Sequence, residues 1–350
     1  MERVDIELIK GFEQLIKNSS KSIVLVPHRN PDGDAMGSVF GLWRVLKNAG
    51  LKVQIVSPTK YPEFYHWMDG HEEVINFSHH PKQSARALDE SDLLICMDFN
   101  QLSRLGDMQP LVESYTGKKV LIDHHPYPGN FTDLVISDIT YSSTAELIFS
   151  VLQSTEFASY IDRNAATSFF TGIMTDTGSF DFNVSNPNTF EVVAQLTRMG
   201  IDQPDIHSRV YDNYSVDRMR LMGFCLSNRM TVYPEYHAAC MYITLEDQKA
   251  FNFKTGDNEG FVNMPLSIKG IVFSVLFTEK EKYIKASFRS KGEFAVNEVS
   301  EKYFNGGGHR NAAGGELYAS LAETLAQFEK LLPEFEDRIK QSVNKKQRRK

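Results

Sequence analysis

The chain has 350 residues, of which 41% are hydrophobic and 24% charged, so it can bury the core of one large or two medium globular domains and is not a disordered protein. Lys and Arg number 38 against 45 Asp and Glu, and this net charge of −7 argues against a surface built to cover nucleic acid or an anionic membrane. Five basic side chains gather at 345–350, KKQRRK, which we expect to be a solvated chain end, so the remainder is more acidic still. Such a body needs metal ions or a small basic pocket to accept a phosphorylated substrate.

The sequence shows no targeting or membrane signal. Its first 18 residues follow an amphipathic helical pattern with charges throughout, unlike a signal peptide. No run of about 18 apolar residues predicts a transmembrane helix. The three cysteines, Cys96, Cys225 and Cys240, lack metal or disulfide spacing, which favours a reducing compartment. We therefore expect a cytoplasmic protein.

The first half of the chain alternates strand and helix patterns. Apolar, β-rich runs occupy residues 22–26, 51–56, 92–98 and 118–124, and a helical pattern occupies residues 35–48. This alternation predicts an α/β domain with a mostly parallel sheet covered by helices. In such sheets ligands bind beyond the carboxyl ends of the strands.

The second half predicts a separate, smaller α/β domain. Residues 187–228 read as helices without a strong strand, and we interpret them as a linker. Strand-like runs, a glycine cluster at 306–308 and a final helix over about 320–341 follow. The expected organisation is a catalytic domain over 1–186, a linker over 187–228, a second domain over 229–344 and a basic tail over 345–350. Two domains joined in this way predict a cleft between them.

Potential metal ligands follow the first strand. The segment PHRNPDGDAMGS at 27–38 places His28, Asp32 and Asp34 on a tight turn that leads into a helix. An N-cap within a turn accounts for one aspartate, because Asp and Gly are common there. It leaves His28 and the second aspartate unexplained.

Carboxylates or imidazoles also follow the later strands. Asp98 follows one strand, Asp123, His124 and His125 follow the next, and Asp176 follows a helix-like apolar segment. If these strands are neighbours, all these groups meet at one edge of the sheet. Many carboxylates with few imidazoles favour Mn²⁺ or Mg²⁺ over zinc, and five or more ligands suggest two ions. Two such ions can activate a nucleophile at phosphorus, so the pattern predicts phosphoester hydrolysis.

These motifs, in this order, resemble those of the DHH phosphoesterases, whose HxNPDGDAxGS loop, strand-end Asp, Asp-His-His triplet and TDTGxF segment all recur here. The resemblance implies two divalent cations, Mn²⁺ first and Mg²⁺ as the alternative. It assigns His28 and Asp32 to one ion, Asp34 and His124 to the other, and Asp98 and Asp176 to both.

The same resemblance implies roles for residues around the ions. His125 would position or protonate the substrate, and Asp123 would orient a histidine. Arg104 matches a position near the scissile phosphate, which suits a bidentate guanidinium. Arg29 departs from the family, which often has an apolar residue there, and it can add a phosphate contact.

The second domain carries its own signature. The segments YIKASFRS at 283–290 and NGGGHRNAAGGE at 305–316 resemble the DHHA1 domain that accompanies the DHH domain. Backbone N–H groups of a glycine cluster can hold an anion. The residues that the resemblance assigns to a clamp for phosphate and base are Arg289, Ser290, Gly307, Gly308 and His309.

Domain size restricts the expected substrate. Long single-stranded DNA needs an extended basic groove, for which this acidic chain has no room. Compact two-domain members of the family trim very short RNAs and remove the 3′-phosphate of 3′-phosphoadenosine 5′-phosphate (pAp), which is the leading expectation here. Hydrolysis of cyclic dinucleotides or of pApA, hydrolysis of polyphosphate, and nucleotide binding without turnover are the alternatives. A homodimer is left open, and no membrane partner is expected.

Overall fold

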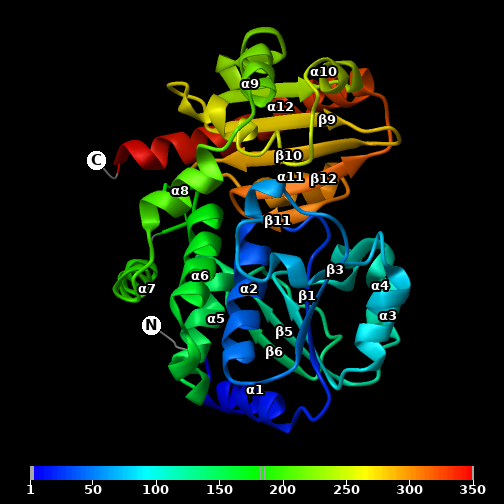
Figure 1. Ribbon diagram of the computed structural model, residues 1–350. Helices are drawn as coiled ribbons and strands as arrows, with labels where there is room; N and C mark the ends of the chain where they lie inside the picture. Colours follow the sequence, from blue (N-terminus) through cyan, green and yellow to red (C-terminus); the bar gives the residue numbers. More distant parts are fainter. Residues whose placement is uncertain (1–3, 182, 185, 349–350) are drawn as a thin grey trace. The chain divides into compact units, whose positions relative to one another are not determined.

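The computed structural model describes residues 4–181, 183–184 and 186–348, which divide into two compact units, Met1–Asn213 and Tyr214–Lys350 (Figure 1). The segment predicted as a linker contains three helices. Two of them, α7 (Pro187–Arg198) and α8 (Gln203–Tyr211), lie in the first unit, and α9 (Val216–Asn228) lies in the second.

The first unit is built on a six-stranded sheet in which every pair of neighbouring strands is parallel, which confirms the predicted α/β class. The strand order is β3-β2-β1-β4-β5-β6. The strands are β1 (Ile23–Pro27), β2 (Val53–Ser57), β3 (Val74–Asn76), β4 (Leu93–Met97), β5 (Lys118–Asp123) and β6 (Leu134–Ser137). The edge strands β3 and β6 were not predicted, because they are short and mostly half-buried and therefore lack a continuous apolar run.

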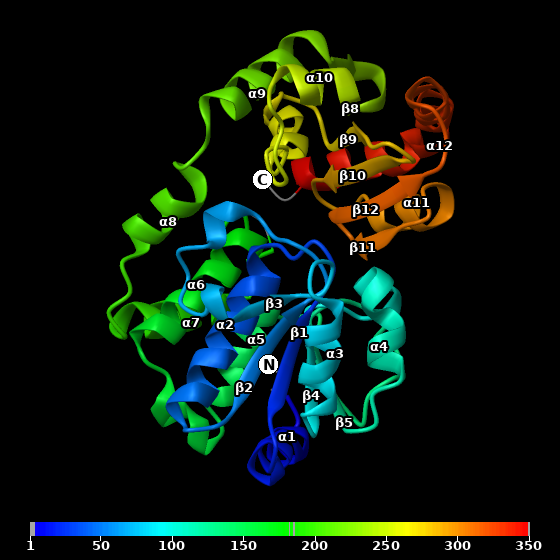
Figure 2. The same cartoon turned by 45° about the vertical axis from the view of Figure 1, so that its right-hand side comes forward.

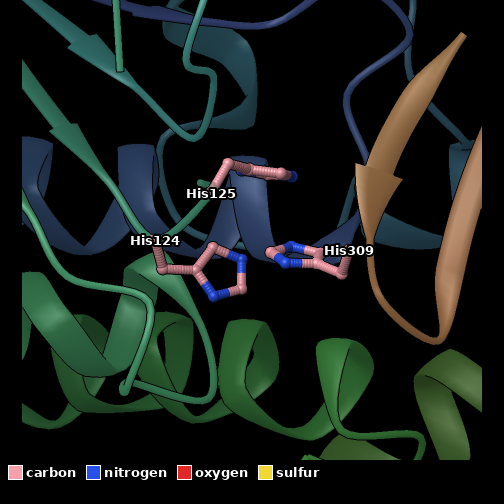
Figure 3. A group of neighbouring side chains, drawn as sticks. All are labelled: His124, His125 and His309. Carbon is pink, nitrogen blue, oxygen red and sulfur yellow. The ribbon is translucent and has the colours of Figure 1, made fainter. Parts of the chain in front are cut away.

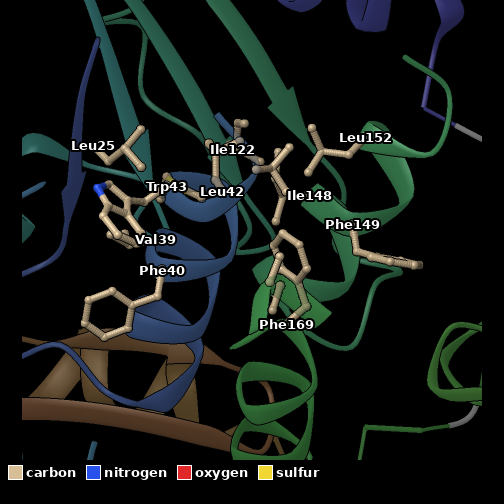
Figure 4. Packing of buried hydrophobic residues seen from close by; sticks show 14 of the residues in the cluster. Leu25, Val39, Phe40, Leu42, Trp43, Ile122, Ile148, Phe149, Leu152 and Phe169 are labelled. Carbon is tan, nitrogen blue, oxygen red and sulfur yellow. The ribbon is translucent and has the colours of Figure 1, made fainter. Parts of the chain in front are cut away.

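Alternate side chains of the central strands enter two different cores. Leu25 and Ile122 pack with α2, α5 and α6 on one face, and Val24 and Cys96 pack on the other face near α3 (Figures 2 and 4). The helices of this unit before α7 are α1 (Ile6–Asn18), α2 (Gly33–Asn48), α3 (Pro81–Asp89), α4 (Gln109–Glu113), α5 (Thr144–Leu152) and α6 (Arg163–Asp176). Its short 3₁₀ segments are η1 (Glu63–Tyr65), η2 (His71–Glu73), η3 (Leu102–Met108) and η4 (Glu156–Tyr160). Helices on both faces explain why the central strands β1 and β4 are buried along their whole length.

The helices α2 and α6 pack backbone against backbone, and a glycine permits it. A Cβ atom on Gly37 would lie 2.6 Å from the carbonyl oxygen of Ser168 and 2.7 Å from the amide nitrogen of Gly172. Any side chain there would therefore push the two helices apart. This matters for the site described below, because α2 carries Asp34 in its first turn and α6 ends at Asp176.

We predict that Gly37→Ala destabilises the first unit by about 1–3 kcal/mol, the usual penalty for overpacking a core. Gly223→Ala in α9 is the matched control, since nothing lies within 4 Å of an added Cβ there and alanine favours a helix. Urea denaturation of both variants checks this. Equal stability of the two would show that α2 and α6 do not need this close contact.

The second unit contains a mixed six-stranded sheet of order β11-β12-β10-β9-β8-β7, in which only β8 and β9 run parallel. Its strands are β7 (Met230–Tyr233), β8 (Ala238–Ile243), β9 (Phe273–Glu279), β10 (Ile284–Ser290), β11 (Gly307–His309) and β12 (Ala312–Leu317). Its remaining helical segments are η5 (Pro234–Tyr236), α10 (Leu245–Ala250), η6 (Phe261–Ser267), α11 (Val296–Tyr303) and α12 (Leu321–Arg348).

The final helix is longer than expected. It reaches Arg348 instead of ending near residue 341, so the backbone of the basic segment is helical as far as the structure describes it. Among the described residues, no helix combines the length and apolar character that crossing a bilayer requires.

Candidate functional site

The candidate site lies at the carboxyl edge of the first sheet. Crossovers from β1 lead to β2 on one side, and the chain later enters β4 on the other side of β1. Ligands of open α/β sheets bind at such a reversal of strand order. His28 follows β1, Asp98 follows β4, and Asp123 ends β5, so the sheet brings the predicted groups to this point.

One cluster joins His28, Asp32 and Asp98, each of which offers a ligand atom within 4.8 Å of the others. The Nε2 atom of His28 lies 3.5 Å from Asp98 Oδ2 and 3.9 Å from Asp32 Oδ2. The Nδ1 atom of His28 lies 2.7 Å from the carbonyl oxygen of Arg29 and donates to it, which turns the lone pair of Nε2 toward the carboxylates. Asp32 also caps α2, because its Oδ1 accepts from the amides of Asp34 and Ala35.

A second cluster joins Asp34, His124 and Asp176 in the same way. The Nε2 atom of His124 lies 3.7 Å from Asp34 Oδ2, 3.5 Å from Asp176 Oδ2 and 3.8 Å from Asp98 Oδ1. Asp34 and His124 are each only 2% exposed. Asp98 thus lies near imidazoles of both clusters.

His125 has a different environment from His124, although the two rings are neighbours, with centroids 4.9 Å apart and planes at 75° (Figure 3). Its Nδ1 lies 2.7 Å from Oδ1 of Asp123, which is fully buried. Asp123 therefore fixes the ring orientation of His125, whereas the sequence had not indicated which histidine Asp123 would orient.

Two arginines lie on the adjoining loops. Arg104 is exposed on η3, and its carbonyl oxygen accepts from the amide of Arg29 at 2.8 Å. Burial lowers the pKa of His28 and of His125, and the charge of Arg104 lowers both further. The side chain of Arg29 lies against Gly106, where an added Cβ would lie 3.3 Å from Arg29 Cδ.

In the second unit, the predicted clamp residues lie on three neighbouring strands. Arg289 pairs with Ala312 across β10 and β12, and Ala312 pairs with His309 across β12 and β11. Directly opposed residues share a face of a sheet, so Arg289 and His309 (the latter labelled in Figure 3) project from the same face, about 10 Å apart. Small Ala312 lies between them.

The remaining clamp residues shape this surface. Gly307 and Gly308 belong to β11, and Gly308 has φ 137°, with an added Cβ only 2.6 Å from the carbonyl oxygen of Ala312. The hydroxyl of Ser290 donates to the carbonyl of Phe294 and accepts from the side-chain amide of Asn311. Ser290 thus ties the end of β10 to the turn between β11 and β12.

Models of two protein families match these two regions of the chain. The DHH family N-terminal domain matches residues 22–173, and the DHHA1 domain matches residues 237–343. The chain belongs to the DHH/DHHA1 phosphoesterase family.

Relatives of this DHH/DHHA1 protein carry several activities in their names. An exopolyphosphatase-related protein from Bacteroides fragilis is 38% identical, covers 97% of this chain and 99% of its own, and superposes with a TM-score of 0.91. The bifunctional oligoribonuclease and PAP phosphatase NrnA of Bacillus subtilis is 28% identical over 90% of this chain and 96% of its own length. The cyclic-di-AMP phosphodiesterase PdeA of Listeria monocytogenes is 26% identical over 94% of this chain but only 49% of its own length.

The carboxylates of this DHH domain fit a bound cation. Burial and the neighbouring charge of Asp32 raise the pKa of Asp34 to about 7. Burial and the charges of Asp34, Asp32, Asp123 and Asp176 raise the pKa of Asp98 well above its usual range. Buried like charges repel unless positive charge is added, and an oxygen-rich donor set with few imidazoles suits hard divalent cations. The protein is therefore a metal-dependent phosphoesterase.

The sequence interpretation missed the residues that hold these carboxylates. Asp34 accepts from the amides of Thr144 and Ala145 at the start of α5, at 2.7 and 2.9 Å, and the hydroxyl of Thr144 donates to Asp98 Oδ1 at 2.9 Å. Fully buried Glu146 shapes this turn by accepting from Ser142, Asn188 and Thr189. The spacing Ser143-x-x-Glu146 is an N-cap signature that could have located this helix start.

We predict that Asp98→Asn raises the unfolding temperature of the metal-free protein, because it removes one ionisable carboxyl from a buried cluster that disfavours its charged form. The same variant should gain less stability from Mn²⁺ than the wild type does, since a ligand that binds more weakly stabilises the folded protein less. Thermal unfolding with EDTA and with Mn²⁺ measures both effects.

Exposed Asp89, at the end of α3, provides the matched control, and Asp89→Asn should change neither quantity. A metal-free Asp98→Asn protein that melts below the wild type would contradict the proposed repulsion.

Proposed function

We propose that the protein degrades very short RNA oligonucleotides to mononucleotides and removes the 3′-phosphate of pAp. The observation that carries the proposal is the joint presence of a complete ligand set at one sheet edge and of similarity to NrnA along nearly the full length of both chains. The acidic composition supports a small substrate over long nucleic acid.

The two clusters suggest how two ions would be held. His28 and Asp32 would bind one ion, Asp34 and His124 the other, and Asp98 and Asp176 would contribute to both. The position of Asp98 supports this division, since its Oδ2 lies near His28 and its Oδ1 near His124. When bound, two such metal ions would activate the attacking water and neutralise charge on the phosphoryl group.

The protein's own residues orient the substrate. Asp123 holds Nδ1 of His125, so Nε2 is the ring nitrogen that would contact a phosphoryl or leaving oxygen. Arg104 would stabilise charge on the phosphoryl oxygens through its fork of donors. Arg29 would add a second cationic contact, because the backbone bond to Arg104 ties the two loops together.

The second unit carries the proposed clamp for a phosphate or base. Arg289 and His309 share a face of the sheet. The glycines of β11 have no side chains that would cover that face. A phosphate or base of a nucleotide fits such a surface, and Ser290 would help to fix its geometry.

Polyphosphate hydrolysis is the second candidate, because the 38% identical relative from Bacteroides fragilis is named as exopolyphosphatase-related. Hydrolysis of cyclic dinucleotides or pApA is a third, because PdeA matches most of this chain. All three use the same metal site.

Purified protein with Mn²⁺ should be incubated in parallel with a 5′-labelled RNA trimer, pAp, pApA, cyclic di-AMP and polyphosphate. We expect mononucleotides from the trimer and inorganic phosphate from pAp. Inertness on both substrates with rapid loss of pApA or cyclic di-AMP would replace the proposal by cyclic-dinucleotide turnover. Phosphate release from polyphosphate alone would replace it by the second candidate.

We predict that Asp98→Ala lowers kcat on the RNA trimer by at least about 100-fold, as expected when a preorganised electrostatic group at the reacting centre is lost. Asp89→Ala should retain full activity. Exhaustive chelation should abolish turnover of the wild type, and added Mn²⁺ should restore it. Full activity after chelation would exclude a metal-dependent mechanism.

A further inference from the structure

A tyrosine with an unusual backbone lies close to the candidate site. Tyr127 follows His125 by two residues. The residue is 76% exposed, and its φ is +59°. Bulky residues rarely adopt positive φ, because the Cβ atom crowds the backbone. Such outliers persist where surrounding contacts enforce them, and they are frequent at ligand-binding positions.

The contacts that enforce this conformation come from the loop after β4. The side-chain amide of Asn100 donates to the carbonyl of Pro126 at 2.6 Å, and that of Gln101 donates to the carbonyl of Tyr127 at 3.1 Å. The amide of Gly129 donates to the carbonyl of Asn100 at 2.7 Å. Three hydrogen bonds therefore pin the backbone on both sides of the tyrosine and leave its ring outside.

Packing and proline stiffen the same loop. Phe131 stacks on fully buried Phe99, with ring planes 5° apart and centroids at 6.1 Å. Pro126 and Pro128 flank Tyr127 and fix their own φ angles. The ring of Tyr127 is thus presented by a preorganised segment and not by a flexible loop, so little conformational freedom is lost when a ligand covers it.

The position of the loop indicates what covers the ring. The two loops that meet here follow β4 and β5 and contain Asp98 and His125, the groups expected next to the substrate phosphate. The Cα atoms of His125 and Tyr127 are at most about 7 Å apart, because two residues separate them along the chain. Tyr127 therefore lies within a nucleotide's length of the expected phosphate position. A flat, exposed aromatic ring with a polar edge suits stacking against a nucleobase, whatever its sequence.

We propose that Tyr127 is a stacking platform for the base of the nucleotide whose phosphate occupies the metal site. This makes it a substrate-positioning residue without sequence preference, and the assignment rests on the proposed function. Because stacking acts on the base alone, the ring should strengthen binding of nucleotides and have no effect on ligands that lack a base.

The test compares AMP with ribose 5-phosphate, which differ only in the base, by calorimetric titration of the Mn²⁺-loaded protein. Tyr127→Asn removes the ring and tolerates positive φ. It should weaken AMP binding by about tenfold and leave ribose 5-phosphate binding unchanged. Tyr127→Phe retains the ring and should bind both ligands as the wild type does.

Two further variants keep the result interpretable. Tyr127→Gly relieves the backbone strain, so it should reproduce the loss of AMP binding while melting no lower than the wild type. Tyr160, which is 40% exposed on η4 before the start of α6, is the control, and Tyr160→Ala should bind AMP normally. Equal weakening of AMP and ribose 5-phosphate, or unchanged AMP binding in Tyr127→Asn and Tyr127→Gly, would overturn the assignment.

A wild-type protein that hydrolyses the RNA trimer and pAp but shows unchanged AMP binding without the Tyr127 ring refutes the stacking role alone. A wild-type protein that hydrolyses neither substrate refutes the proposed function itself.

Discussion

Repulsion among buried carboxylates is the constraint on which the rest of the first unit depends. Asp34 and Asp98 are each 2% exposed, and the charges of Asp32, Asp123 and Asp176 add to the field at Asp98. An arrangement of this kind opposes folding unless protons or cations compensate it. The same crowding of carboxylates that opposes folding also favours divalent cations, which the surrounding imidazoles and carboxylate oxygens can coordinate.

The scaffold holds this unfavourable arrangement by using the ends of helices. Asp32 accepts amides at the start of α2, and Asp34 accepts amides at the start of α5, where the helix dipole favours negative charge. Asp176 ends α6, whose position follows from the close packing at Gly37. Backbone amides therefore compensate the charge of Asp32 and Asp34, and the hydroxyl of Thr144 donates to Asp98.

Much of this arrangement could be predicted, because buried parallel strands have a continuous apolar sequence. The candidate metal ligands stand at or directly after the ends of these strands. The apolar sequence runs that contain β1, β4 and β5 predicted the sheet. His28, Asp98 and His124 were identified as candidate ligands because they follow these runs. The half-buried strands β3 and β6 lack that pattern. The spacing of Ser143 and Glu146 could have located the start of α5, but the roles of Thr144 and Glu146 depend on tertiary contacts. Thr144 donates to Asp34 and Asp98, and Glu146 accepts from Asn188 and Thr189 of α7. Tyr127 reads as an ordinary turn residue until its φ and its exposure are known.

Counting the Mn²⁺ ions bound per chain tests the central claim most directly. Isothermal titration of metal-free protein, checked by metal analysis after desalting, gives the number. We predict two ions per chain, because two clusters of ligands lie at one sheet edge and Asp98 is close to an imidazole of each. A chain that binds no Mn²⁺ would show that the carboxylates are compensated in another way, and a single ion under saturating conditions would contradict the shared, two-ion arrangement.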